Sequence, residues 1–275
     1  MTGPLLAAAA ARLAAAGIGS PRVDAELLLA HALGVPRSQL LFAAAPPPDV
    51  AARYETAVGR RAAREPLQHI TGAAPFRHLE IAVGPGVFVP RPETELLVDA
   101  VLPVLGRPAE VAVDLCSGSG ALALAIADES SVPRVLAVER PGPAFAWLRR
   151  NVAGTRVEAE EGDVRDRTLL DDLRGTVSAV VCNPPYVPAA TDVAAEVRFD
   201  PDVAVFAGPD GLAIMPAVIA RSAELLRRGG VLALEHDDTQ GAAVPALLAA
   251  DGRWTDIADH HDLTGRPRYA TATRR

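Results

Sequence analysis

The chain has 275 residues, of which 49% are hydrophobic, so it can form one large domain or a small and a medium one, each with a full core. Its formal net charge of -7 argues against a dedicated nucleic-acid binder, because such proteins carry a basic surface. Two cysteines exclude a disulfide framework and no apolar run reaches the roughly 18 residues of a membrane span, so we expect a cytoplasmic protein with no membrane partner.

Residues 1–64 have a helical pattern. The alanine-rich start is interrupted by Arg12 at helical spacing, which indicates an amphipathic helix rather than a signal peptide. Ser20 and Pro21 predict the N-cap and the first residue of a second helix, and Asp49 starts a further one. No set of residues of catalytic type occurs here, so we interpret this part as a small helical bundle for recognition or docking.

Glycines and prolines divide residues 65–90 into short strand-like pieces such as Leu79–Val83. This punctuation predicts a β-hairpin that links two domains. We therefore expect an N-terminal helical domain at residues 1–72, a hairpin linker at residues 73–90 and a larger domain at residues 91–275.

The segment Pro90–Glu95 leads into a helical run at residues 96–105. Glu93 and Glu95 suit the first turn of that helix, because the helix dipole favours acidic side chains there. Arg91 has no such local explanation. Arg91 and Glu93 are candidates for the entrance of a binding site, and packing between the domains is the alternative.

From residue 110 onward, strand and helix patterns alternate. Strands are expected at residues 111–115, 134–138, 156–160, 179–182 and 231–235, and helices at residues 121–127, 145–152, 214–227 and 244–250. Such alternation predicts a mostly parallel sheet with helices on both faces, the α/β class. Strand-like pieces around Ile257 and Tyr269 predict an antiparallel hairpin at one edge.

The first strand of this region meets its helix in a glycine-containing loop. We expect the loop to bind a cofactor through Asp114, Cys116, Ser117, Gly118, Ser119 and Gly120. Glycines there allow a ligand to approach the backbone, and the helix N-terminus offers free N–H groups.

The ends of the next two strands carry acidic residues. Glu139 ends the second strand, where a carboxylate can accept hydrogen bonds from both hydroxyls of a ribose. Asp163 ends the third strand, where it can accept from an adenine amino group, with Val164 against the ring face. These strand ends predict a site for an adenosine group.

The fourth strand runs directly into the corner Asn183-Pro184-Pro185-Tyr186. The prolines stop the strand, because they cannot donate to a sheet ladder and they hold the preceding residue extended. The side-chain amide of Asn183 and the carbonyl of Pro184 can both accept from one planar amino group, while the ring of Tyr186 packs on its plane. The alternative is a plain exit from strand to loop.

Proteins that bind a nicotinamide dinucleotide have a similar glycine loop, so this site has two candidate cofactors. The third position of the dinucleotide fingerprint is Ala123, and the corner at Asn183 serves an amino group rather than a hydride. S-adenosylmethionine contains an adenosine but no pyrophosphate and fits these features better.

The cysteines and histidines have structural interpretations. Cys116 and Cys182 end strands that we expect to be neighbours. We interpret both cysteines as small residues of the core. Oxidation-sensitive cofactor binding is the alternative. The histidines show no metal-ligand spacing, so no metal is expected.

Motifs along nearly the whole chain are shared with one family: Glu65–Gly72, Pro90–Glu95, the glycine loop, Asn183–Tyr186, Gly208–Leu212, Gly229–His236 and Asp262–Arg266. On these motifs the chain resembles the bacterial N5-glutamine methyltransferases that modify peptide chain release factors. The Arg-Pro-Glu-Thr-Glu element before the Asn-Pro-Pro-Tyr corner is the specific part. The glycine loop and the corner are shared with many amino-methyltransferases.

The chain departs from the family pattern at a few positions. Cys116 and Ser117 stand where the family usually has Gly and Thr, and Glu139 replaces the usual Asp. Val164 stands where an aromatic residue is frequent, and Asp200 replaces a common Glu. These departures affect the expected cofactor affinity more than the reaction.

The resemblance implies a class I (Rossmann-like) methyltransferase domain preceded by a helical domain that recognises the release factor. It implies methyl transfer from S-adenosyl-L-methionine to the glutamine of the Gly-Gly-Gln motif, leaving S-adenosyl-L-homocysteine. Asn183, Pro184 and Tyr186 are the expected catalytic residues, and Asn183 is also expected to contact the cofactor. Substrate contacts are expected from the same three residues together with Pro185, Arg91 and Glu93.

We expect a monomer without dedicated nucleic-acid binding. The alternatives are methylation of another protein glutamine, as in a ribosomal protein, and methylation of an exocyclic base amine in a flipped nucleotide. A protein that docks release factors without turnover is the alternative from another class.

Overall fold

The computed structural model describes residues 2–106 and 110–275. The chain forms two compact units. The first, N-terminal unit contains residues 1–73 and 193–199, and the second contains residues 74–192 and 200–275. No helix in the described part of the chain is long and apolar enough to cross a membrane.

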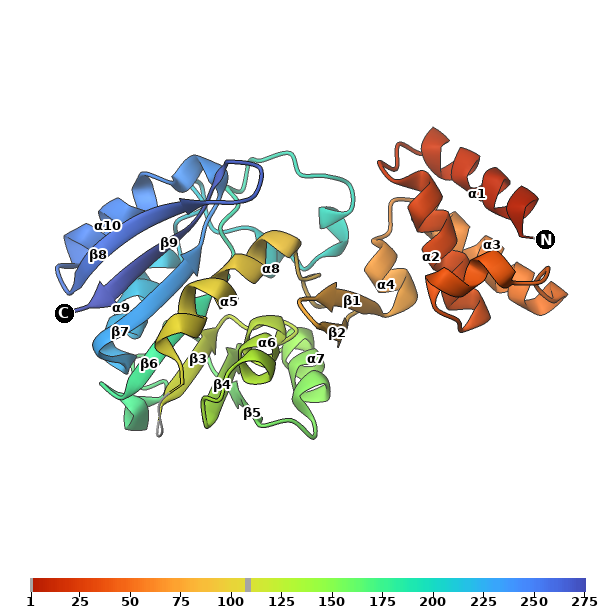
Figure 1. Ribbon diagram of the computed structural model, residues 1–275. Helices are drawn as coiled ribbons and strands as arrows, with labels where there is room; N and C mark the ends of the chain where they lie inside the picture. The colour runs from red at the N-terminus through yellow and green to blue at the C-terminus, as the bar shows by residue number, and fades with distance from the viewer. Residues whose placement is uncertain (1, 107–109) are drawn as a thin grey trace. The chain divides into compact units, whose positions relative to one another are not determined.

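The N-terminal unit is the expected helical bundle. Its core is formed by apolar residues that include the fully buried Leu13, Leu28 and Tyr54. Its helices are α1 (Gly3–Ala15), α2 (Pro21–Leu33), α3 (Pro48–Ala62) and α4 (Leu67–Thr71), with a 3-10 turn at Arg37–Phe42 (Figure 1).

Two local features of this unit differ from the expectation. Ser20 occupies the N-cap position of α2, but its side chain makes no capping hydrogen bond. The helix α4 lies within the expected helical domain at residues 1–72, but beyond residue 64, where the helical pattern of the sequence ends. It is a single short turn that Gly72 ends in a left-handed conformation (φ 81°), which glycine adopts without steric cost.

A buried cation ties the segment 193–199 to this bundle. Nε of Arg61 lies 2.7 Å from Oδ2 of Asp24, and its Nη1 lies 3.0 Å from Oε1 of Glu196. Arg64 reaches the other oxygen of Glu196 at 2.7 Å. Because the charge of Arg61 is paired on two sides, its burial does not leave an uncompensated ion.

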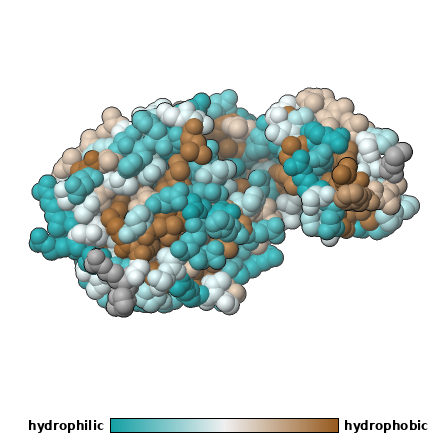
Figure 2. All heavy atoms as spheres, in the orientation of Figure 1, coloured by the Kyte–Doolittle hydropathy of each residue, from teal (hydrophilic) through white to brown (hydrophobic). Residues whose placement is uncertain are grey.

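The surface of the N-terminal unit includes exposed apolar side chains (Figure 2). Leu41 and Phe42, at the end of the 3-10 turn, are 84% and 86% exposed. A hollow of about 450 Å³ beside them is lined by Leu33, Val35, Gln39, Phe42, Ala43, Ala44, Ala45 and Pro47.

The second unit is built on a seven-stranded sheet with the order β5-β4-β3-β6-β7-β9-β8. The strands β3 to β7 pair in parallel, and β9 pairs antiparallel with both β7 and β8. Both the parallel sheet and its antiparallel C-terminal edge are therefore confirmed. The strands are β3 (Val111–Leu115), β4 (Arg134–Glu139), β5 (Val157–Glu161), β6 (Val177–Cys182), β7 (Leu226–Glu235), β8 (Trp254–His261) and β9 (Pro267–Arg274).

Helices cover both faces of this sheet, as Figure 1 shows. Successive strand residues point to opposite faces, so Ala112 packs in one cluster with α5, α6 and α7, while Val113 packs in another with α9 and α10. The helices of this unit are α5 (Glu95–Val101), α6 (Ala121–Glu129), α7 (Pro143–Val152), α8 (Asp202–Val205), α9 (Met215–Leu225) and α10 (Ala243–Asp251).

The expected hairpin is present as β1 (Ala73–Phe76) and β2 (Leu79–Ala82). Phe76 and Ile81 are buried in the cluster that contains α5, α6 and α7, so the hairpin contributes to the core of the second unit. Its role as a linker between domains stays a prediction.

Two helices end earlier than expected. The helix α9 ends at Leu225, two residues short of the predicted end, because Leu226 already pairs with Val177 in the sheet. The helix α5 ends at Val101 and continues only as a 3-10 turn that contains Pro103. Proline lacks the N–H that an α-helix interior needs.

Candidate active site

The strand order places the candidate site at the carboxyl ends of β3 and β6. From β3 the chain moves outward in one direction through β4 and β5, then returns to β6 on the other side of β3. Ligands of open α/β sheets bind where the strand order reverses in this way. Leu115 and Cys182 are register partners, so the glycine loop and the Asn183 corner leave neighbouring strands.

The glycine loop is tied to the sheet and needs its glycines. The N–H of Ser117 donates to the carbonyl of Val138 at 2.9 Å. Gly118 and Gly120 have φ values of 56° and 86°, in the left-handed region that favours glycine. A Cβ on Gly120 would also lie 2.7 Å from Cδ1 of Leu148, which packs over the loop.

Cys116 has the same left-handed conformation, with φ 59°. A side chain in this region costs roughly 1–2 kcal/mol, because its Cβ approaches the following carbonyl oxygen. Glycine, the usual residue of the family at this position, avoids that cost. The departure at Cys116 is therefore a local strain within the loop.

Asp114 supports the start of α6 from the end of β3. Its Oδ2 accepts from the N–H of Ala123 at 3.2 Å, and Ser117 Oγ donates to its carbonyl at 3.0 Å. Burial raises the pKa of Asp114 to about 7. Its carboxylate thus orders the helix N-terminus, and a direct contact with a cofactor stays a prediction.

Glu139 binds the glycine loop directly. Its Oε2 accepts from the N–H of Gly118 at 2.8 Å. Burial raises the pKa of the Glu139 carboxyl above its ordinary value, against the opposing effect of the N–H groups of Gly118 and Arg140. The carboxylate of Glu139 can accept hydrogen bonds from ribose hydroxyls beside the glycine loop, so these residues fit an adenosine-bearing cofactor.

The carboxylate of Asp163 forms an ion pair with Arg165. Its two carboxylate oxygens accept from Nε and Nη2 of Arg165 at 2.9 and 2.5 Å, and this pairing lowers the pKa of Asp163 to about 2. Val164 is buried in the cluster with α9 and α10. An adenine amino group would share Asp163 with Arg165, and both adenine contacts stay predictions.

The side chain of Asn183 is held by a residue from the segment before α5. Its Nδ2 donates to Oγ1 of Thr94 at 3.1 Å. This contact uses the donor side of the amide and leaves Oδ1 as the group available to a substrate. Pro184 is buried and Pro185 is half-buried beside it.

Tyr186 is fixed at both its hydroxyl and its backbone. Its Oη donates to Oε1 of Glu235 at 2.9 Å, and its carbonyl accepts from Nε2 of Gln240 at 3.0 Å. Burial, followed by the nearby Glu235 carboxylate, raises the pKa of Tyr186. A Cβ on Gly211 would lie 2.0 Å from the Tyr186 carbonyl oxygen, so only glycine fits there.

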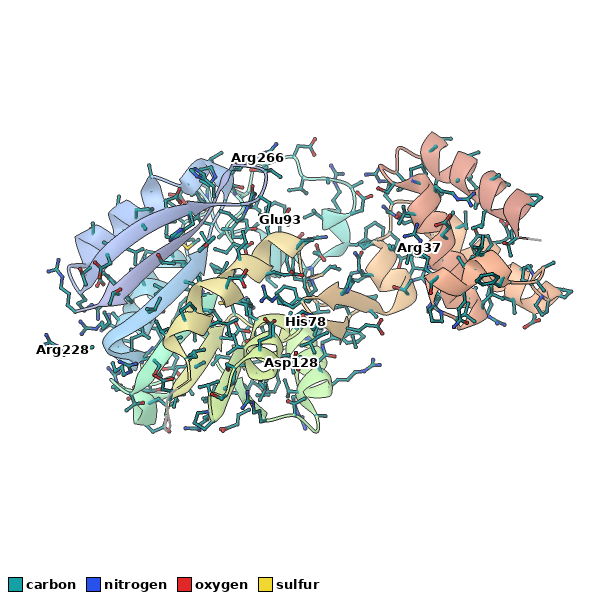
Figure 3. The ribbon with its side chains drawn as sticks, in the orientation of Figure 1. Arg37, His78, Glu93, Asp128, Arg228 and Arg266 are labelled. Carbon is teal, nitrogen blue, oxygen red and sulfur yellow. The ribbon has the colours of Figure 1, made fainter. Side chains whose placement is uncertain are left out.

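Arg91 and Glu93 flank the same region. Nη2 of Arg91 lies 2.6 Å from Oδ2 of Asp200, and its guanidinium lies 5.0 Å from the centre of the Phe88 ring. Glu93 lies in the turn before α5 (Figure 3) and is close enough to Glu235 to raise its pKa. A substrate-contacting role for Arg91 and Glu93 stays a prediction.

The two cysteines have the environment of core residues. Cys182 is fully buried, and burial followed by the neighbouring Cys116 raises the pKa of its thiol. A thiol with a raised pKa is a weak nucleophile, which supports the core interpretation. Oxidation-sensitive cofactor binding stays a prediction. Within residues 2–106 and 110–275, no group of histidine, cysteine and acidic residues is arranged to hold a metal ion.

Three residues of this site were not singled out from the sequence. Thr94, Glu235 and Gln240 hold Asn183 and Tyr186, although they are distant from them in the chain. One signal was present, since Glu235 is an acid at the end of an otherwise apolar strand and charged residues are seldom fully buried without a role.

Comparisons with known proteins give the class of protein. A family model described as the PrmC N-terminal domain matches residues 4–72, and one described as the methyltransferase small domain matches residues 79–199. The fold is that of a T. thermophilus 16S rRNA methyltransferase solved with AdoMet and guanosine, with a TM-score of 0.53 and 23% identity over 74% of this chain and 50% of that one. The fold and the site define a methyltransferase.

The particular family follows from curated relatives. The chain is 51% identical to the release factor glutamine methyltransferase of Mycolicibacterium smegmatis, over 97% of this chain and 95% of the relative. It therefore belongs to the release factor glutamine methyltransferase family. It is also 41% identical to a 4-amino-L-phenylalanine/4-methylamino-L-phenylalanine methyltransferase of Streptomyces pristinaespiralis, over 90% of this chain and 87% of that protein.

Proposed function

We propose that this protein transfers the methyl group of S-adenosylmethionine to the side-chain nitrogen of the glutamine in the Gly-Gly-Gln motif of class-one release factors. The observation that carries the proposal is the orientation of Asn183. Its Nδ2 is occupied by Thr94, so Oδ1 remains to accept a hydrogen bond at the strand end beside the glycine loop. Membership of the family supports a release factor glutamine as the residue whose amide this acceptor would bind.

The main difficulty of the reaction is the weak nucleophilicity of the substrate nitrogen, and the Asn183–Tyr186 corner can increase it. An amide nitrogen is a poor nucleophile, because its lone pair is delocalised into the carbonyl. Asn183 Oδ1 and the Pro184 carbonyl accept its two N–H bonds, direct the lone pair toward the methyl group and stabilise the positive charge that develops on nitrogen. The ring of Tyr186, with its hydroxyl held by Glu235, forms a wall of the pocket.

The cofactor supplies a methyl group on a sulfonium, which is already an activated leaving group. As the new N–C bond forms, the C–S bond breaks and its electron pair stays on sulfur. The proton leaves the substrate nitrogen afterwards, so no general base is needed before transfer. Gly118, Gly120 and Glu139 would hold the adenosine part, with Asp163 and Val164 at the adenine.

The N-terminal unit is the proposed recognition domain. Its exposed Leu41 and Phe42 and the adjoining hollow form an apolar docking surface for the release factor. We expect the enzyme to act as a monomer in the cytoplasm, on protein rather than on nucleic acid, in keeping with its net charge of -7.

A methyl-transfer assay with purified release factor tests this function. Labelled cofactor is incubated with the release factor and with a variant whose Gly-Gly-Gln glutamine is replaced. Label on the first protein alone supports the proposal, and equal labelling of both refutes the assignment of the glutamine. Replacing Asn183 with Ala should abolish turnover while cofactor affinity changes only a few-fold.

A second candidate function is favoured by the S. pristinaespiralis relative, whose name gives arylamines as its substrates. The corner accepts any planar amino group, so 4-amino-L-phenylalanine belongs in the same assay. Turnover of the arylamine without turnover of the release factor would favour this second function. A DNA or RNA substrate would show itself by activity that falls steeply with salt.

A further inference from the structure

The helix α7 connects the end of the hairpin to the glycine loop, and it lies next to β2 in Figure 1. Asn151, in the last turn of α7, donates through Nδ2 to the carbonyl of Ala82, the last residue of β2, at 2.9 Å. The same Nδ2 donates to the carbonyl of Ser119 in the glycine loop, also at 2.9 Å. One side-chain amide therefore joins two segments that are distant in the chain.

The two partners fix the orientation of the Asn151 side chain. Both are carbonyl oxygens, which can only accept hydrogen bonds, and an NH2 group has two protons to donate. If the amide were flipped, its own oxygen would face two other oxygens without a proton between them. Asn151 is therefore a double donor, and this assignment follows from the chemistry of its neighbours.

The bond to Ser119 holds one peptide group of the glycine loop at its second end. The N–H of Gly120 in this peptide group donates to the carbonyl of Ser117 at 2.8 Å, while Asn151 binds the carbonyl of Ser119. Gly120 has φ 86°, and a glycine can adopt either sign of φ at little cost. Without the bond to Asn151, this peptide group could turn over within the loop.

The helix α6 gives the carbonyl of Ser119 no partner of its own. The carbonyl of Gly120 receives the N–H of Leu124 at 2.9 Å, so helical bonding begins one residue after Ser119. The N–H of Ala123, which would serve Ser119 in a longer helix, donates to Oδ2 of Asp114 at 3.2 Å. Ser119 is buried, and a buried carbonyl without a hydrogen bond is costly. Asn151 supplies the missing donor.

The hairpin side of α7 has a further anchor. Nε1 of Trp147 donates to the carbonyl of Pro85 at 3.2 Å. A Cβ on Gly84 would lie 2.7 Å from Cζ2 of the Trp147 ring, so the backbone after β2 packs closely on this ring. Loss of the Asn151 side chain therefore leaves the hairpin attached to α7 but releases the carbonyl of Ser119.

We propose that Asn151 is a positioning residue for the cofactor, which acts through the carbonyl of Ser119 to hold the glycine loop in the conformation that receives S-adenosylmethionine. The proposal rests on the function proposed above, in which Gly118 and Gly120 hold the adenosine part. The loop is then held from two sides, by Glu139 of β4 at the N–H of Gly118 and by Asn151 of α7 at the carbonyl of Ser119.

Two variants of Asn151 test the proposal by isothermal titration calorimetry with S-adenosylmethionine and no methyl acceptor. Asn151→Ala removes both donors and should raise the Kd for the cofactor about 10-fold. Asn151→Asp keeps the shape but turns an oxygen toward the two carbonyls, so its Kd should rise further. At saturating cofactor kcat should be unchanged, because the Asn183 corner is not altered. Wild-type cofactor affinity in both variants, or a loss confined to kcat, would overturn the proposal.

Trp147→Phe is the matched control on the same helix. It removes the donor to the Pro85 carbonyl on the hairpin side and leaves the bond from Asn151 to Ser119 in place. Its cofactor affinity should equal that of the wild type. A loss as large as that of Asn151→Ala would show that the hairpin, and not the carbonyl of Ser119, controls cofactor binding, and the proposal would fall.

Hydrogen exchange in the cofactor-free protein tests the loop directly. In Asn151→Ala the N–H of Gly120 should exchange at least about 10-fold faster than in the wild type, while the N–H of Leu124 in α6 should exchange at an unchanged rate. Equal exchange at Gly120 in both proteins would refute the role of Asn151. Neither calorimetry nor exchange involves the release factor, so failure of the release factor as a substrate would overturn the proposed function and leave both results as they are.

Discussion

The N–H of Gly118 donates a 2.8 Å hydrogen bond to the carboxylate of Glu139, and this bond joins the glycine loop to the end of β4. The same carboxylate is the proposed acceptor for the ribose hydroxyls. One side chain therefore holds the loop and is also the proposed ribose contact, and the chain's use of Glu instead of the family's usual Asp is open to direct test.

Glu139→Ala should weaken S-adenosylmethionine binding by at least about 10-fold, because it removes the ribose acceptor and releases Gly118 together. Glu139→Asp keeps a carboxylate and should cost much less. Isothermal titration calorimetry with the cofactor measures both. If the Ala variant binds as tightly as the wild type, Glu139 does not contact the ribose.

Asp114→Asn should stabilise the protein at pH 8 by about 1–3 kcal/mol. Burial raises the pKa of Asp114 to about 7, so the folded state binds a proton more tightly than the unfolded state. Stability therefore falls as the pH rises toward 7, and asparagine removes this dependence while its Oδ1 still accepts from Ala123. Thermal unfolding of both proteins across this pH range is the measurement. If stability depended on pH in the same way in both proteins, Asp114 would not have a raised pKa in the folded state.

Cys116→Gly should raise stability by about 0.5–1 kcal/mol, because relief of the left-handed strain exceeds the added entropy of glycine in the unfolded chain. Cys116→Ala is the matched control, since it removes the thiol but keeps a Cβ at φ 59°. Denaturant unfolding compares the two. Equal stability of the Gly and Ala variants would show that the backbone at this position is not strained.

Gly211→Ala should lower kcat more than 10-fold with unchanged cofactor affinity, because its Cβ would displace the carbonyl of Tyr186. Gly265→Ala is a matched control. Gly265 has a similar φ of 81°, against 75° for Gly211, but a Cβ there meets nothing within 4 Å. Both variants carry the same backbone strain, so a loss of kcat shared by both would indicate general destabilisation instead of a displaced Tyr186.

Phe42→Ser should raise the KM for the release factor about 10-fold and leave kcat unchanged, because the exposed ring belongs to the proposed docking surface and not to the site of transfer. Leu263→Ser, at another largely exposed apolar residue, in the second unit, should change neither constant. Steady-state kinetics with purified release factor provide the measurement. An unaltered KM for Phe42→Ser would place docking elsewhere.

The helices and strands were largely predictable because their signals are local. A pattern of only a few residues predicts the apolar strand Val177–Cys182, and another predicts the glycine loop. The alternation of strand and helix patterns predicts a parallel sheet. The end of α9 was not predictable in this way, because it depends on the pairing of Leu226 with Val177 in the folded sheet.

For this protein the amino-acid sequence by itself determined the α/β architecture, the glycine loop and the Asn183-Pro184-Pro185-Tyr186 corner. Only the tertiary structure decided which residues form hydrogen bonds with Asn183 and Tyr186 and so orient their side chains. Thr94 and Asn183 are 89 positions apart, and Tyr186 and Glu235 are 49 apart. Periodic burial and turn chemistry act between near neighbours in the chain, whereas a hydrogen bond between distant residues exists only after the sheet has brought their strand ends together.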